Sequence, residues 1–158
     1  MTVEIVARRL QGVFCNEETS PLADKEDLFT DVVINLPMAL DAAAGTDTVY
    51  ASFKAPWRFQ VLEAIICPGS AMTGATATAN TYTLAKADGA GGSATTIATF
   101  VSITGADFVA DVFKAMTLSA TLANTFVADG QIVTLKKTHA STGTVSPASM
   151  LSIRVRKY

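Results

Sequence analysis

Residue types that build catalytic and metal sites are scarce in this chain of 158 residues, which has one histidine and two cysteines. His139 has no second histidine or nearby cysteine beside it in sequence, so we expect an exposed loop residue rather than a metal ligand or general base. Cys15 and Cys67 are far apart and form no C-x-x-C motif, which favours two buried free thiols in a protein made in a reducing cytoplasm. We therefore predict no catalytic residues, no metal and no cofactor.

Long apolar runs are also missing. No window reaches the roughly 18 consecutive apolar residues of a membrane-spanning helix, and Arg8 and Arg9 interrupt any secretory signal at the N-terminus. Only 16% of the residues are charged and the formal net charge is −2, which gives no reason to expect a nucleic-acid surface. The sequence thus predicts no membrane and no nucleic-acid partner.

Two local patterns resemble functional motifs without meeting their requirements. The glycines at 89, 91 and 92 lack the following Lys-Ser/Thr of a phosphate loop, and a β-branched stretch follows them instead of a helix. Asp107 and Asp111 are four residues apart and would share one face of a helix, where carboxylates commonly serve as capping residues. Neither pattern changes the prediction that the protein is not an enzyme.

The chain is rich in apolar residues, and many of its side chains are small. Apolar residues make up 49% of the sequence, and 26 alanines and 21 threonines account for much of its small-residue character. This composition excludes intrinsic disorder, and the length suits one domain with a real core. The apolar fraction is high for a monomer, which is typical of proteins whose surfaces are buried between subunits.

We divide the chain into an N-terminal arm with a connecting loop, residues 1–47, and a β domain, residues 48–158. The arm carries scattered apolar residues between charges, and we expect these to bind a partner subunit: Val3, Ile5, Phe14, Leu28 and Phe29. Residues 1–31 hold three basic and seven acidic residues, whereas residues 136–158 hold five basic and no acidic ones. The two segments can attract each other within one subunit or between neighbours, or they are unrelated solvated faces.

The β domain shows apolar and polar residues alternating in short segments separated by turn residues. The alternation predicts strands at residues 48–54, 58–66, 78–87, 95–101, 131–137 and 150–156, with a short one at 126–127. The segment 58–66 is almost entirely apolar after Gln60, which predicts a central strand covered on both faces. Residues 107–116 fit either a short helix, because their large apolar residues recur at helical spacing, or the start of a strand that ends at Leu118.

About eight strands with regular turns indicate an all-β, jelly-roll-like antiparallel sandwich with an extended N-terminal arm and one optional short helix. Trp57 follows Pro56 at the start of a strand and is a candidate anchor for a sugar or a partner, although such residues more often pack at the rim of a core.

Residues 61–158 resemble the small jelly-roll proteins of tailed bacteriophages that decorate, or cement, capsids. The likeness lies in the strand before Pro68-Gly69, the Thr-rich strand with its Gly-rich hairpin, the turn at 127–130 and the terminal strand. It implies a structural protein of the virion, synthesised in the host cytoplasm, that binds the major capsid protein and copies of itself as a homotrimer. The alternative is a carbohydrate-binding jelly-roll module of a tail, fibre or adhesin, with Trp57 or Tyr82 as the stacking platform.

Overall fold

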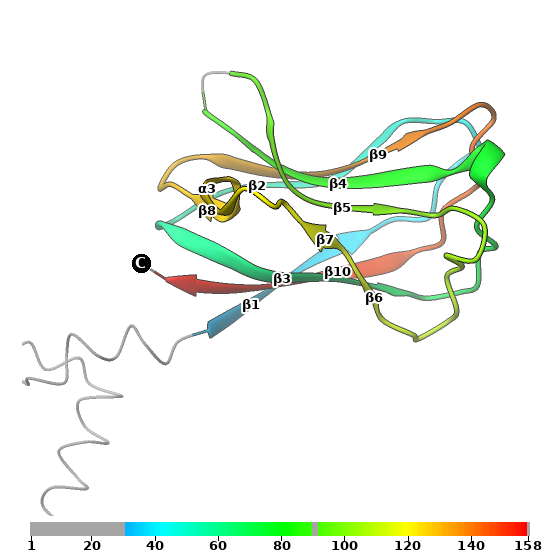
Figure 1. Cartoon of the computed structure of the whole chain (residues 1–158), viewed down its shortest axis with the longest axis horizontal. Coiled ribbons are helices and arrows are strands. Elements are labelled where there is room, and N and C mark those ends of the chain that lie inside the picture. The colour runs from blue at the N-terminus through cyan, green and yellow to red at the C-terminus, as the bar shows by residue number, and fades with distance from the viewer. Residues whose placement is uncertain (1–30, 90–91, 158) are drawn as a thin grey trace, which may run out of the picture.

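A computed structural model of the chain describes residues 31–89 and 92–157 and shows two antiparallel sheets packed face to face (Figure 1). The β1 sheet has the order β1-β10-β3-β6, and β8 also pairs with β3. Its strands are β1 (Asp31–Met38), β3 (Phe59–Pro68), β6 (Lys114–Ala115), β8 (Phe126–Val127) and β10 (Ser149–Lys157). The β2 sheet has the order β2-β9-β4-β5-β7. Its strands are β2 (Thr48–Lys54), β4 (Asn80–Ala87), β5 (Thr95–Val101), β7 (Thr117–Leu118) and β9 (Ile132–His139).

The strands pair from the two ends of the domain inward. β1 pairs with β10 and β2 with β9, while β4 pairs with its sequence neighbour β5. Consecutive strands β1 to β4 therefore alternate between the sheets, which is the topology of a jelly roll. The predicted all-β sandwich is confirmed. The described residues also contain a 3-10 turn, η1 (Thr76–Thr78), and one four-residue helix, α3 (Leu122–Thr125).

The core lies between the sheets and is built by period-two alternation. On β10, Leu151, Ile153 and Val155 are fully buried while the residues between them face outward. Three aromatic rings close one end of the core, with Phe108 lying 5.5 Å from Tyr82 and 5.4 Å from Phe100 between ring centroids.

Of the two alternatives predicted for residues 107–116, the short helix is wrong, and strand structure begins only at Lys114, with β7 ending at Leu118 as the second alternative has it. Phe108 pairs with Met72 in an isolated antiparallel bridge and is buried in the core, so this stretch is an irregular loop leading to β6. Asp111 has a φ of 59°, which a continuing right-handed helix does not allow. The helical spacing of its apolar residues reflects two core anchors, Phe108 and Met116, with the exposed residues Val109, Val112 and Phe113 between them.

Residues 31–38, which the sequence places in the arm, form strand β1. Pro37 suggests a break, but β1 is an edge strand, and an edge position tolerates a residue without a backbone N–H. The remaining arm, residues 1–30, lies outside the described part of the chain.

A buried ion pair joins the connections at one end of the sandwich. Asp41, in the β1–β2 loop, accepts a hydrogen bond from Lys137 of β9, and neither side chain is exposed to solvent. The Asp41 carboxylate also accepts hydrogen bonds from the Ser146 backbone N–H at 2.9 Å and the Tyr50 hydroxyl at 2.7 Å. Thr48 donates a longer one of 3.3 Å. A buried charge is tolerated when it is paired and its remaining sites are hydrogen-bonded, as they are here.

A second layer of buried polar groups extends this network. The Tyr82 hydroxyl lies 2.6 Å from the Ser146 hydroxyl, and Asn80 donates to the Thr144 carbonyl at 2.7 Å. The Asn80 side chain also donates to the Ser146 hydroxyl at 3.1 Å. The backbone N–H of Asn80 donates to the Ser102 hydroxyl at 2.9 Å. The network therefore holds the loop before β10 against β4 and the start of β2.

The network controls the protonation of its carboxylate. Burial alone would raise the pKa of Asp41, but the hydrogen bonds from Lys137, Ser146 and Tyr50 outweigh it and hold this pKa below its usual value. Burial also raises the pKa of Tyr82, and burial and the nearby Asp41 charge raise that of Tyr50, so both phenols stay protonated.

Replacing Asp41 with alanine should destabilise the domain by about 3–5 kcal/mol, because the change leaves the Lys137 ammonium buried without a partner. Asp47 is a matched control in the same loop, since its side chain is 62% exposed while hydrogen-bonded to His139. The change Asp47→Ala should cost about 1 kcal/mol or less. Urea denaturation of both variants and the wild type measures the difference, and equal losses would contradict a special role for Asp41.

The domain should lose stability as the pH falls below about 4, the unperturbed aspartate range. The pKa of Asp41 is lower in the folded state, so its contribution is present above the unfolded value and is lost as pH falls through the folded one. Urea denaturation at a series of pH values from 6 to 2 should give a steeper decline for the wild type than for Asp41→Asn. Parallel curves would show that Asp41 does not carry the effect.

Candidate interaction surface

The outer face of the β1 sheet combines an apolar half with a charged half. The inward residues of β1, β3 and β10 are buried against the β2 sheet, so the residues between them face away from the core. The register aligns the outward residues in rows across the sheet: Pro37 with Met150 and Cys67, Asn35 with Ser152 and Ile65, and Val33 with Arg154 and Glu63.

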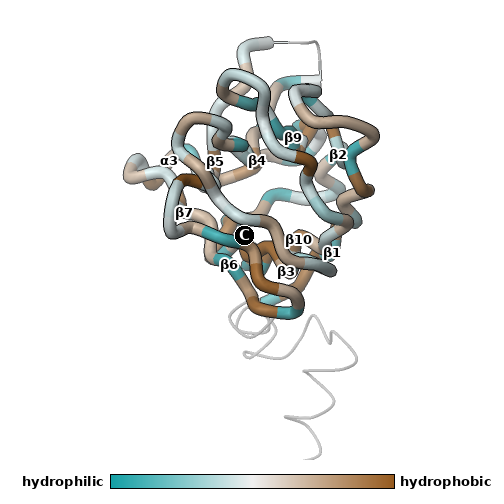
Figure 2. Tube along the Cα trace, turned by 90° about the vertical axis from the view of Figure 1, so that its right-hand side faces the viewer, coloured by the Kyte–Doolittle hydropathy of each residue, from teal (hydrophilic) through white to brown (hydrophobic). Residues whose placement is uncertain are grey.

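The first row lies at the end of the sheet near β6 and, together with Ile65 of the second row and residues at β6, forms what we call the apolar patch. Ala115 of β6 is paired with Ile65, and Phe113 directly precedes β6, which extends the apolar surface beyond Cys67. Phe113 is 63% exposed and Met150 41%. The patch consists of Pro37, Ile65, Cys67, Phe113, Ala115 and Met150. Figure 2 shows hydrophobic colouring on the lower loop beside the β3 and β6 labels.

This patch explains the apolar run of β3. The sequence predicts a strand covered on both faces, but within this domain only the inward face of β3 is covered, where Ala64 and Ile66 are buried. Ile65 and Cys67 on the other face are only half-buried. The prediction is therefore wrong for the isolated domain, and the expected burial of both thiols does not hold for Cys67. An apolar outer face of this kind is typical of a surface that another molecule covers.

The other end of the same face carries a charged cluster. Arg154 lies between Asp31, at 3.2 Å, and Glu63, at 3.3 Å, and Arg156 contacts Asp31 at 3.0 Å. The hydrogen bond from Arg156 is the main cause that lowers the pKa of Asp31. The acidic N-terminal segment and the basic C-terminal strand thus attract each other in part within one subunit, because Asp31 pairs with Arg154 and Arg156.

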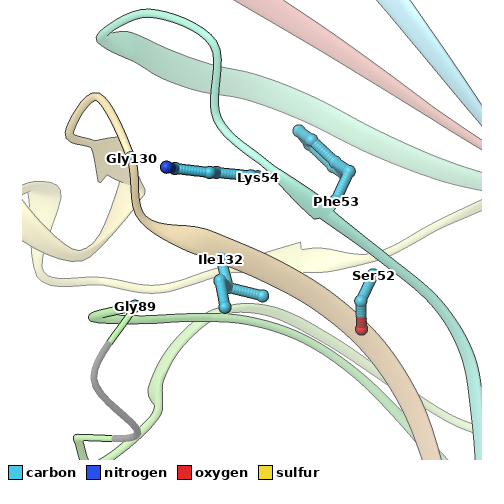
Figure 3. A pocket seen from close by; sticks show the side chains of 6 residues that line it. All are labelled: Ser52, Phe53, Lys54, Gly89, Gly130 and Ile132. Atoms are coloured by element: carbon cyan, nitrogen blue, oxygen red, sulfur yellow. The ribbon is translucent and has the colours of Figure 1, made fainter.

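A shallow depression of about 350 Å³ lies at the edge of the other sheet, between β2 and the turns before β5 and β9 (Figure 3). Its described lining residues are Ser52, Phe53, Lys54, Gly89, Gly130 and Ile132. Lys54 is the one charged side chain in that lining. The depression therefore does not bring together the paired acid and base groups that hydrolytic chemistry requires.

The two aromatic residues considered as sugar platforms have different positions. Tyr82 is fully buried and hydrogen-bonded to Ser146, so its interpretation as a stacking platform is wrong. Trp57 lies in the β2–β3 connection, half-buried and packed against the core, and its Nε1 is buried without a hydrogen-bond partner. The predicted arm contacts Val3, Ile5, Phe14, Leu28 and Phe29 lie outside the described residues.

Of the remaining candidates from the sequence, His139 and Asp107 have structural partners. The sequence predicts an exposed loop residue at His139, but this residue is the last of β9, with only 22% of its side chain exposed and its Nδ1 2.7 Å from Asp47. Asp107 accepts a hydrogen bond from the Gly74 N–H at 2.7 Å, and Asp111 is exposed. Residues 31–89 and 92–157 contain no group of three potential metal-ligating side chains. Across the same residues, no helix is long and apolar enough to cross a membrane.

Comparison with known proteins gives little further information. No family model and no curated protein matches the chain. The solved structures with a similar arrangement include those of infectious bursal disease virus strains Gx and Gt, at 12% and 14% identity and TM-scores of 0.42 and 0.38. They cover 79% and 80% of this chain, which spans about a third (32%) of theirs.

Neighbouring residues on β10 should separate surface from core. Leu151 is fully buried, so Leu151→Ala should destabilise the domain by about 2–5 kcal/mol. Met150 points outward, and Met150→Ala should cost about 1 kcal/mol or less. Urea denaturation measures both, and a large loss for Met150→Ala would show that this residue belongs to the core and that the patch is not a free surface.

Proposed function

We propose that this chain is a non-enzymatic structural protein of a bacteriophage virion. Its role is that of a capsid decoration, or cement, protein that binds the major capsid protein and copies of itself, as a homotrimer. The observation that supports this most is the apolar patch on the outer face of the β1 sheet, with the charged cluster of Asp31, Glu63, Arg154 and Arg156 at the other end of the same face.

The arrangement suits a protein–protein contact. Interfaces have an apolar centre, in which aromatic residues and methionine are enriched, and a polar rim. Phe113 and Met150 supply the apolar centre, and the ion-paired arginines at the other end of the same face supply charged groups at its edge. Charged groups at one side of an apolar contact contribute mainly to orientation and partner choice, which a regular surface lattice requires.

The buried ionisable groups support a structural role over a catalytic one. Asp41, Lys137 and Tyr82 are enclosed in the core, and their polar atoms are bound to one another or to neighbouring backbone and hydroxyl groups. Groups held in this way stabilise the fold and cannot reach a substrate. Internal hydrogen bonds also hold the pKa of Asp41 below its usual value, and burial raises the pKa of Tyr82.

The proposal is tested on particles. Mass spectrometry of intact, purified virions should detect this chain in many copies, and added recombinant chain should bind saturably to particles that lack it. The variant Met150→Glu should reduce this binding at least about tenfold, because a charge in an apolar contact costs more than about 1.4 kcal/mol.

Val145→Glu is the matched control. Val145 is 40% exposed, as Met150 is 41% exposed, but it lies in the loop between β9 and β10 and is not part of the patch. Its change should leave binding within about twofold of the wild type. Absence of the chain from intact virions would reject the decoration role, and equal binding by both variants would reject the patch as its binding surface.

A further inference from the structure

We propose that the apolar patch of one copy binds the N-terminal segment, residues 1–30, of a second copy. This inference rests on the proposed structural function and names the partner of its surface. The contact is heterologous: each copy would give its segment to one neighbour and receive the segment of another on its β1 sheet. Heterologous contacts close into rings when the rotation between copies allows it, in agreement with the proposed homotrimer.

The composition of the segment fits the patch. Residues 1–30 hold large apolar residues in short groups, among them Val3, Ile5, Phe14, Leu28 and Phe29. Their burial against Phe113 and Met150 would remove apolar surface from water on both sides of the contact.

Charge favours the same pairing. Residues 1–30 contain three basic and six acidic residues, a net charge of −3. The described residues contain nine basic and eight acidic ones, a net charge of +1. The segment of one copy is therefore attracted to the domain of another, whereas two domains repel each other weakly.

The direction of β1 favours a neighbour over the same chain. The segment joins the domain at Asp31, within the charged cluster, whereas Pro37 of the patch lies six residues further along the strand, about 20 Å away. Figure 1 shows the start of β1 at the left end of the molecule and the loop before β6 at the right end. The chain before Asp31 therefore begins at the end of the sheet opposite to its own patch.

For the residues closest to the domain, the length of the intervening chain rules out contact with the patch of the same copy. Leu28 and Phe29 are only two or three residues from Asp31 and can extend about 10 Å from it at most, so they cannot touch their own patch. A full segment of 30 residues spans at most about 100 Å, which is ample for an adjacent domain.

The test measures association of the full chain by sedimentation velocity over a range of concentrations. The wild type should form closed oligomers. The patch variant Phe113→Glu/Met150→Glu and the segment variant Leu28→Glu/Phe29→Glu should each associate at least about tenfold more weakly. Val145→Glu is the control and should associate as the wild type does. At concentrations at which the wild type is also monomeric, thermal unfolding should show the same Tm for the patch variant and the control, since both sites are exposed.

A mixture of the two defective variants is decisive. One keeps an intact segment and the other an intact patch, so together they should form a one-to-one complex that neither forms alone. Association of the segment variant at wild-type strength would show patch-to-patch contact and overturn the proposal, as would a mixture that stays monomeric. A wild-type chain that is monomeric alone but binds capsids would reject this contact while leaving the decoration role in place.

Discussion

The contact on which the rest of the structure depends is the buried pair of Asp41 and Lys137. A charge that is removed from water is costly unless its partner stays in place, so the β1–β2 loop and β9 cannot separate. Ser146 donates to the same carboxylate, which brings in the loop that precedes β10. β1 pairs with β10, and β2 pairs with β9. The Asp41 carboxylate, in the loop from β1 to β2, therefore connects this pair of strands in one sheet with the pair in the other.

This arrangement leaves the outer face of the β1 sheet available for other contacts. The core is complete between the sheets, and the large side chains that remain on the outer face, Phe113 and Met150, add little to it. Their placement at one end of the sheet, with ion-paired arginines at the other, gives the face a direction. A directional face on a stable sandwich is what a subunit needs in order to join a lattice in one orientation only.

Much of the fold follows from the sequence because period-two alternation is a local property, and strands β2 and β5 begin and end where alternation places them. β1 is harder to predict because Pro37 suggests that the strand is broken there. The strand continues through Pro37 because β1 lies at the edge of its sheet, where a residue without a backbone N–H is tolerated. Residues 107–116 mislead because Phe108 enters the core from a loop. Lys137 continues the inward series of Val133 and Leu135, so its burial was detectable, but its partner Asp41, 96 residues away, was not. The patch is visible in sequence only as the apolar run of β3, which does not show which face the domain leaves open.

An electron cryo-microscopy reconstruction of particles that carry the chain would show whether the outer face of the β1 sheet joins this domain to other subunits. We expect this attachment to appear as density of a neighbouring subunit against Phe113 and Met150, with the β2 sheet turned away from the contact. A reconstruction in which the β1 sheet faces solvent and the domain is held by its β2 sheet would contradict it.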